Sequence, residues 1–84
     1  MYQLNLDKNA KNFLKKLKKA EQNFILNKLE KLKSEPDLGK RLSGNLFGLW
    51  KLRIDKYRVL YKIFENKLVI VVLDIGHRKN VYYR

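Results

Sequence analysis

The stretch that decides the fold runs from residue 50 to residue 61 and reads WKLRIDKYRVLY. Apolar and polar residues alternate on both sides of the Asp55-Lys56 pair, which is the pattern of two strands joined by a two-residue turn. Such a turn sets three apolar pairs on one face, namely Ile54 with Tyr57, Leu52 with Val59, and Trp50 with Tyr61. The sequence therefore predicts an antiparallel hairpin with one apolar face that a second layer must cover.

The opposite face of this hairpin collects cations. It receives Lys51, Arg53, Arg58, Leu60 and Lys62. Arg53 should lie directly opposite Arg58, with Lys51 on the diagonal, and like charges opposed across two strands destabilise a sheet by about 0.2–1 kcal/mol. Exposed charges repel weakly in salt, so a solvated surface is one interpretation. We favour a binding site, because three cations converge on a concave sheet face without one carboxylate.

Two strand-like segments flank the hairpin. Residues 68–75 are apolar on both faces, as expected of an interior strand, and follow a short turn near residues 65–67. At the N-terminus Tyr2, Leu4 and Leu6 alternate with polar residues, which predicts a short half-buried strand. The short turn requires the last strand to lie beside the second strand of the hairpin.

Two amphipathic helices are predicted between the first strand and the hairpin. The first follows Asp7, a residue type that caps helix N-termini. Its apolar stripe has helical spacing and consists of Ala10, Phe13, Leu14 and Leu17. The second is expected from about Glu21 to Ser34, before Pro36, and its stripe consists of Phe24, Ile25, Leu29 and Leu32. The two helices should form a hairpin.

The predicted fold class is α+β, in the order N-terminal strand, helical hairpin and three-strand antiparallel meander. The helices should pack on one face of the sheet, because the apolar faces of both layers need cover. A polar, glycine-containing stretch at residues 37–48 is expected to connect the second helix to the sheet. A chain of 84 residues corresponds to one domain, residues 1–84.

Composition narrows the setting of the protein. The sequence has no cysteine, so neither a disulfide framework nor a thiolate zinc site is expected. The longest apolar run, residues 68–73, is far shorter than the roughly 20 residues of a membrane span. Residues 1–9 lack the apolar core of a secretory signal. We therefore expect a cytoplasmic protein with no membrane partner.

Charge is the strongest compositional signal. Twenty Lys and Arg residues against eight Asp and Glu residues give a formal net charge of +12. A field of this sign attracts polyanions, nucleic acid first and an anionic membrane or acidic protein second, although a lysine-rich solvated surface is the alternative. Residues 7–33 hold nine lysines and no arginine, whereas four of the five arginines follow residue 50. We interpret the helical lysines as a solvated face and the late arginines as phosphate ligands, since guanidinium offers a planar fork of donors.

The C-terminal segment adds groups that could act on RNA. Gly76-His77-Arg78 ends the last strand, and Tyr82 and Tyr83 follow. Histidine is the side-chain type whose charge changes near neutral pH, so His77 is a candidate acid, although a lone histidine is more often structural. Tyrosine rings stack on bases and their phenols can carry protons, although a terminal tyrosine is usually a packing residue.

Residues 50–61, with Ile75-Gly-His-Arg78 and Val81-Tyr82, resemble the RelE/ParE toxin superfamily. The Tyr-Arg-Val-Leu-Tyr and Gly-His-Arg…Val-Tyr blocks are fairly specific together, and the order of helical hairpin and meander extends the resemblance over nearly the whole chain. The resemblance implies the RelE-like fold and a toxin of a type II toxin–antitoxin system. RelE-like members are implied to be ribosome-dependent endonucleases that cut mRNA in the decoding site and are neutralised by a cognate antitoxin.

The resemblance also implies site residues, position by position. Arg58 matches the arginine of the family's Tyr-Arg motif, and Arg78 matches the arginine after the last strand. Tyr82 matches the C-terminal tyrosine that stacks on the substrate base. Lys51 matches the first basic residue of the strand pair.

At two positions the sequence departs from the family's pattern. Arg53 stands where some members have a second lysine; it keeps a cation but cannot supply a proton at neutral pH. His77 replaces a basic residue in some members, so its part in catalysis is open. The implied RNA-binding set comprises Lys51, Arg53, Arg58, Lys62, Arg78, Lys79 and Tyr82.

RNA cleavage without metal uses the 2′-OH as nucleophile against the adjacent phosphate, and the protein aligns the attack and moves two protons. The sequence has no carboxylate cluster of the two-metal type, so no metal and no cofactor are expected. Arg58 and Arg78 would hold the phosphate, and Arg53 would add charge. Lys51, among cations that favour its neutral form, is the candidate base. Tyr82 or His77 would serve as the acid.

Three alternatives stay open, one of which is a toxin that has lost its activity. ParE-like members share the fold but inhibit DNA gyrase, and they usually lack this basic and tyrosine set. A non-catalytic RNA-binding domain would use the same cations without cleavage. Keeping Lys51, Arg58, Arg78 and Tyr82 together favours the nuclease, whose partners would be the ribosome, mRNA and an antitoxin, with a heterotetramer as one form of the antitoxin complex.

Overall fold

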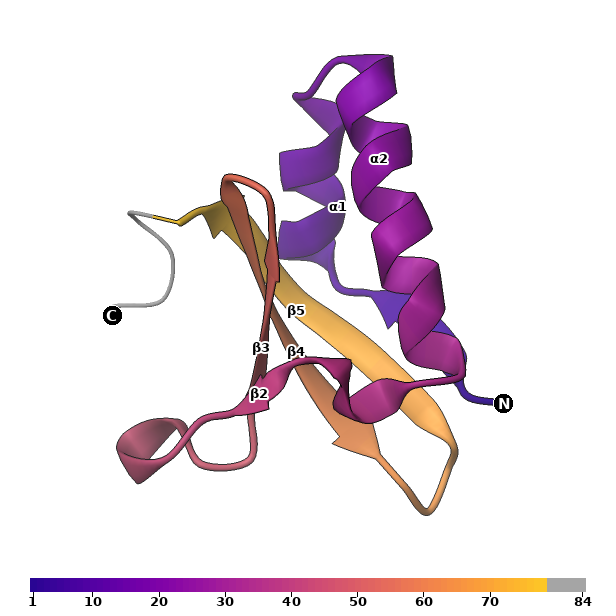
Figure 1. Ribbon diagram of the computed structural model, residues 1–84, viewed down its shortest axis with the longest axis vertical. Coiled ribbons are helices and arrows are strands. Elements are labelled where there is room, and N and C mark those ends of the chain that lie inside the picture. The colour runs from indigo at the N-terminus through magenta and orange to yellow at the C-terminus, as the bar shows by residue number, and fades with distance from the viewer. Residues whose placement is uncertain (79–84) are drawn as a thin grey trace.

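The computed structural model describes residues 1–78 and confirms the α+β class. Two helices, α1 (Lys8–Lys15) and α2 (Lys19–Glu30), pack on one face of a five-stranded sheet (Figure 1). The strands are β1 (Gln3–Leu6), β2 (Lys40–Arg41), β3 (Trp50–Ile54), β4 (Tyr57–Phe64) and β5 (Val69–His77). We call the other face of the sheet, which carries no helix among the described residues, the open face.

The strands lie in the order β1-β5-β4-β3-β2. The meander β3-β4-β5 is antiparallel, as predicted, and β1 joins it parallel to β5. Because β1 and β4 flank β5, residues 69–72 have strand neighbours on both sides, so β5 is an interior strand, as predicted. The N-terminal strand therefore completes one edge of the sheet.

The stretch at residues 37–48, predicted only as a connection, contains β2. Its Lys40 pairs with Lys51 and its Arg41 with Trp50, so β2 forms the second edge of the sheet. Two residues are too few to show the alternation by which a strand is recognised in a sequence. Short 3-10 helices lie on either side of β2, at Pro36–Leu38 and Gly44–Leu46.

The hairpin at residues 50–61 has the predicted register. Ile54 pairs with Tyr57 across the Asp55-Lys56 turn, and Arg53 lies opposite Arg58. Asp55 adopts a left-handed conformation with φ 53°, which an aspartate tolerates better than most residues. The pairing holds the apolar side chains of both strands toward the helices.

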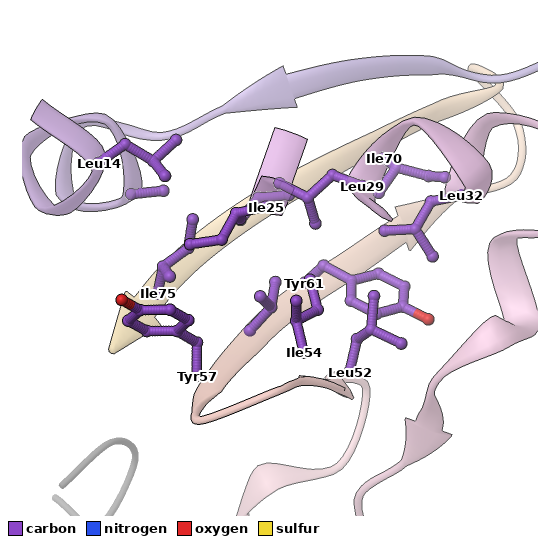
Figure 2. Close-up of a cluster of buried hydrophobic side chains, with 13 residues drawn as sticks. Leu14, Ile25, Leu29, Leu32, Leu52, Ile54, Tyr57, Tyr61, Ile70 and Ile75 are labelled. Atoms are coloured by element: carbon purple, nitrogen blue, oxygen red, sulfur yellow. The ribbon is translucent and has the colours of Figure 1, made fainter. Parts of the chain in front are cut away.

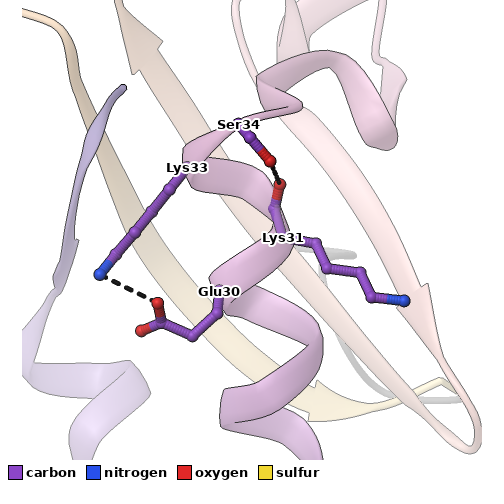
Figure 3. A network of polar contacts seen from close by, with 4 residues as sticks. All are labelled: Glu30, Lys31, Lys33 and Ser34. Atoms are coloured by element: carbon purple, nitrogen blue, oxygen red, sulfur yellow. Dashed lines mark hydrogen bonds and ion pairs between the residues drawn. The ribbon is translucent and has the colours of Figure 1, made fainter.

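The helix boundaries follow local signals. The Lys8 N–H donates to the Asp7 carboxylate at 2.8 Å, which confirms Asp7 as the cap of α1. Helix α2 begins at Lys19, two residues before the predicted start, and continues as a 3-10 turn at Lys31–Lys33. There Lys33 forms an ion pair with Glu30 at 3.0 Å and the Ser34 hydroxyl donates to the Lys31 carbonyl at 3.4 Å (Figure 3).

The core lies between the helices and the sheet (Figure 2). Its largest fully buried side chains are Tyr61, Ile25, Leu29, Leu32, Ile70, Val59 and Val72. A register shift between Leu60 and Tyr61 on β4 keeps both Val72 and Ile75 of β5 on this buried side, although they are three residues apart. Burial of this apolar surface is the main stabilising term, at about 25 cal/mol per Å².

The prediction that Phe24 faces the core is wrong. Its side chain is 44% exposed, and the Lys28 ammonium lies 5.7 Å from the centre of its ring. Ile25, Leu29 and Leu32 already complete the buried stripe, and Phe24 lies about 100° around the helix from Ile25. The phenyl ring therefore covers the side of α2 rather than the sheet.

Candidate functional site

Four basic side chains from three neighbouring strands line a pocket of about 150 Å³ on the open face. They are Lys40 of β2, Lys51 and Arg53 of β3, and Arg58 of β4, and we call this site the cationic pocket. No carboxylate is among the described residues that line it. Three of the four were candidates from sequence, and the structure brings them together.

Strand register creates this cluster. Arg53 is paired with Arg58, and Lys40 is paired with Lys51, so the pocket consists of two cross-strand pairs of like charge. Side chains at paired positions are about 4.5–5.5 Å apart at their Cβ atoms. Like charges at this spacing concentrate positive potential in the pocket.

The pocket has a partly buried floor. Lys51 and Arg58 are half-buried, and the Nε atom of Arg58 is shielded from solvent. Leu60, which lies opposite Lys51 on the same face, is only 7% exposed and is not part of the core beneath the helices. Charges that are partly removed from solvent are screened less than charges in open water.

Lys40 is the member of the pocket that sequence reasoning missed. Its strand was not predicted, so nothing set it beside Lys51. A strand of two residues leaves no alternation in the sequence, so no local signal could have placed Lys40 there.

Arg78 lies at the turn end of the open face, outside the pocket lining. Its backbone N–H donates to the Lys56 carbonyl at 3.0 Å, and its guanidinium approaches the Asp55 carbonyl at 3.5 Å. It follows Gly76, the β5 partner of Arg58, by two residues. Arg78 is therefore near the Arg53–Arg58 end of the site, with its side chain exposed.

The structure does not bring His77 into the cationic pocket. Its ring lies 5.7 Å from Phe13 and 5.4 Å from Tyr57, in an aromatic cluster on the helix side of the sheet. Burial, with the nearby Glu21 carboxylate, raises the pKa of the Tyr57 phenol in this cluster. Strand alternation could have indicated this placement, because His77 is two residues after the core residue Ile75.

The remaining candidates lie apart from the pocket or beyond the described range. Lys62 is exposed on β4, with its ammonium 5.3 Å from the centre of the Phe64 ring, and does not line the pocket. Lys79 and Tyr82 lie outside the described residues. Their roles stay predictions from sequence.

The described residues show neither a metal site nor a membrane-spanning helix. Within residues 1–78, no three His, Asp or Glu side chains lie close enough together to hold a metal ion. No helix in that range is long and apolar enough to cross a membrane.

Comparison with known proteins gives the family. The family described as ParE toxin of type II toxin-antitoxin system, parDE, matches residues 2–82. Toxin RelG of Mycobacterium tuberculosis (strain ATCC 25618 / H37Rv) is 37% identical over 47 residues, which cover 56% of this chain and 54% of that protein. The chain thus spans about half the length of the curated relative that it matches.

Solved structures agree with this assignment. The RelBE2 toxin–antitoxin complex of Mycobacterium tuberculosis matches with a TM-score of 0.84 and 29% identity, over 92% of this chain and 98% of that one. The RelE–RelB complex of Pyrococcus horikoshii OT3 matches with a TM-score of 0.76 and 25% identity, over 95% and 98%. The isolated Escherichia coli RelE toxin shares the fold, with a TM-score of 0.77 and 21% identity, over 98% and 89%. The chain therefore belongs to the RelE/ParE superfamily of toxins of type II toxin–antitoxin systems.

Proposed function

We propose that this toxin is a ribosome-dependent endoribonuclease that cleaves mRNA in the decoding site without a metal ion. The observation that carries the proposal is the cationic pocket, in which four basic side chains surround a volume of about 150 Å³. A phosphodiester is the anion that a nucleic acid presents, and arginine forks match its oxygens in geometry as well as charge. Resemblance to RelE-type toxins supports the choice of RNA.

The reaction is an internal transesterification. The 2′-oxygen of the upstream nucleotide attacks the phosphorus, and the bond from phosphorus to the 5′-oxygen breaks. A base removes the 2′-OH proton, and an acid protonates the departing 5′-oxygen. The products are a 2′,3′-cyclic phosphate and a 5′-OH, and the transition state carries extra negative charge on the non-bridging oxygens.

The pocket residues can be given roles in this reaction. Arg53 and Arg58 would hold the non-bridging oxygens, since both point their charge into one pocket from opposed positions. Arg78, near the same end of the site, would hold the phosphate from the C-terminal side. Lys51, which lines the same pocket, would take the 2′-OH proton. Tyr82, from its match to the family motif, would supply the second proton and stack on the base.

The chemistry of the pocket fits a metal-free mechanism. Its four side chains are all cationic, and such groups repel divalent metal ions rather than ligate them. Stabilisation of the developing charge is then left to the guanidinium groups. The set contains few ordinary acid and base groups, so the free toxin should be a poor ribonuclease. The ribosome would supply the alignment of the 2′-OH, the phosphorus and the 5′-oxygen.

An antitoxin is the second proposed partner. The matched solved structures from Mycobacterium tuberculosis and Pyrococcus horikoshii OT3 are toxin–antitoxin complexes. We propose that an acidic or amphipathic antitoxin segment binds this chain, whose net charge is +12, along the helical hairpin or over the cationic pocket. The toxin and the antitoxin would meet in the cytoplasm, where translation takes place.

Cleavage on programmed ribosomes tests the proposal. The purified toxin should cut mRNA only with ribosomes present, and end analysis should find a 2′,3′-cyclic or 3′-phosphate and a 5′-OH. A chelator that removes trace transition metals, with Mg²⁺ kept for the ribosome, should change nothing. The matched control is Lys15→Ala, which removes an exposed cation from α1 and should cleave normally. Intact mRNA, together with inhibited supercoiling by DNA gyrase, would refute the proposal and favour the ParE-like function.

A further inference from the structure

A buried tyrosine contacts the turn that leads into β2, the strand that supplies Lys40. Tyr61 of β4 lies in the core with no exposed surface, and its hydroxyl reaches the turn ahead of β2. The Gly39 N–H donates to this hydroxyl at 2.9 Å, and the hydroxyl donates to the Pro36 carbonyl at 2.8 Å. One side-chain oxygen therefore holds both ends of the turn formed by residues 36–39.

Gly39 lets this turn come close to the sheet. A Cβ atom at this position would lie 2.8 Å from the Tyr61 hydroxyl oxygen and would collide with the backbone carbonyl of Lys51. Any other residue would push the turn away from β3. Because Lys40 directly follows Gly39, contact of the turn with Tyr61 and Lys51 fixes where the Lys40 side chain starts.

Strand β2 is short, and further contacts join it to β3 and to the residue before β3. The Arg41 guanidinium lies 5.5 Å from the centre of the Trp50 ring, and the N–H of Leu42 donates to the Leu49 carbonyl at 2.9 Å. The strand consists of two residues at an edge of the sheet and has β3 as its one strand neighbour. Burial raises the pKa of the Tyr61 phenol above its ordinary value, so the hydroxyl stays protonated and able to donate at neutral pH. At neutral pH the Tyr61 hydroxyl therefore keeps both hydrogen bonds to the turn ahead of β2.

We propose that Tyr61 is a positioning residue of the cationic pocket, and that Lys40, which it places, contacts the RNA phosphate next to the one that is cleaved. This inference rests on the proposed function. Strand β2 lies two strand spacings, about 10 Å, from β4, which carries Arg58. Lys40 is exposed at that edge of the pocket, so it reaches a neighbouring phosphate along the same strand of RNA.

Binding of a non-cleavable RNA tests the inference without relying on catalysis. The probe is a short single-stranded RNA with 2′-O-methyl groups, and its affinity is measured by fluorescence anisotropy over a range of salt concentrations. Lys40→Ala should weaken binding about fivefold at low salt and reduce the slope of log affinity against log salt by about 0.7, the effect of one lost phosphate contact. Lys40→Arg should restore both values.

Tyr61→Phe should reproduce the effect of Lys40→Ala, because it releases the turn while leaving every charge in place. The double variant should bind no more weakly than Lys40→Ala alone. Tyr57→Phe is the matched control, since it removes a buried phenol from the same strand and face, near Phe13 and His77 rather than near β2. Gly39→Ala approaches the same contact from the other side and should also lower the salt slope.

Several outcomes would overturn the inference. These are a wild-type salt slope in both Tyr61→Phe and Gly39→Ala, losses that multiply in the double variant, or an equal loss in Tyr57→Phe. The melting transition of every variant is determined by circular dichroism, and binding is measured at temperatures below it. Unfolding then cannot be mistaken for weaker binding. Wild-type toxin that binds programmed ribosomes but leaves mRNA intact would refute the proposed cleavage alone. Equal slopes for wild type and Lys40→Ala would refute the inference alone.

Discussion

Threonine substitutions at Arg53 and Arg58 can separate the effect of this opposed pair on the stability of the fold from its proposed part in RNA cleavage. The two arginines are cross-strand partners on β3 and β4, and both line the cationic pocket. Threonine is a good strand residue, so the sheet should accept it at either position. Each arginine also has surroundings of its own that threonine would change. A double-mutant cycle is therefore needed, because it subtracts those separate effects and leaves the interaction between the pair.

The expected coupling follows from the register. Like charges at paired positions destabilise a sheet by about 0.2–1 kcal/mol, and either single substitution removes the whole of that repulsion. The double variant removes it only once. The changes in unfolding free energy of the two single variants, added together, should therefore exceed the change in the double variant by about 0.2–1 kcal/mol in the stabilising direction. In a domain of this size, 1 kcal/mol corresponds to about 4–8 °C in melting temperature.

Two further measurements complete this experiment, the coupling energy at high salt and the rate of mRNA cleavage. The coupling, from urea unfolding, should shrink in 1 M salt, where the Debye length falls to about 3 Å. Cleavage on programmed ribosomes by Arg58→Thr should drop about 100-fold, the usual scale for losing one donor to the transition state. A coupling of zero at low salt would show that repulsion is absent from the fold. Wild-type cleavage by Arg58→Thr would refute the assignment of this residue to the reaction.

Three further predictions concern pH, packing and the partner. Burial raises the pKa of Tyr61 above its ordinary value of 10.0, so the unfolding free energy should hold below pH 10 and fall as pH rises further. In urea melts the fall should be smaller for Tyr61→Phe than for wild type. Leu29→Ala should lower the unfolding free energy by about 2–5 kcal/mol, whereas Phe24→Ala should change it by about 0.5 kcal/mol, and equal losses would contradict the placement of Phe24. The protein encoded beside this gene should raise the melting temperature of the toxin, because a ligand present at 100 times its Kd adds about 2.7 kcal/mol to the unfolding free energy. An unchanged melting temperature would contradict the antitoxin proposal.

Features encoded by neighbouring residues could be predicted from the sequence. The turn at Asp55-Lys56 and the alternation on either side of it fix the pairing of Arg53 with Arg58, because a two-residue connection allows one register. The cap at Asp7 depends on a single hydrogen bond to the next residue. Both features need only a few residues of context, which explains why the meander and the helical hairpin were predicted.

Features that depend on distant contacts could not be predicted in this way. The hydroxyl of Tyr61 meets Gly39, 22 residues earlier, and no local pattern marks this pair. As a result β2 and the contribution of Lys40 to the pocket were missed. The prediction that Phe24 faces the core was wrong for a related reason. Helical spacing shows which side of a helix is apolar, but it does not show how wide the buried part of that side is. The other side chains of α2 were enough to fill the space above the sheet.

The two faces of the sheet differ in what their side chains do. The helix side holds the connected core that stabilises the protein, and its side chains have little freedom to change. The open face holds the cationic pocket, where like charges are paired across neighbouring strands. A chain can therefore keep this scaffold while altering the charges of the open face, which is why the shared fold does not distinguish a nuclease from a gyrase inhibitor. Under the proposed function that distinction depends on the open face, where two cross-strand pairs of like charge would bind an RNA phosphate between them.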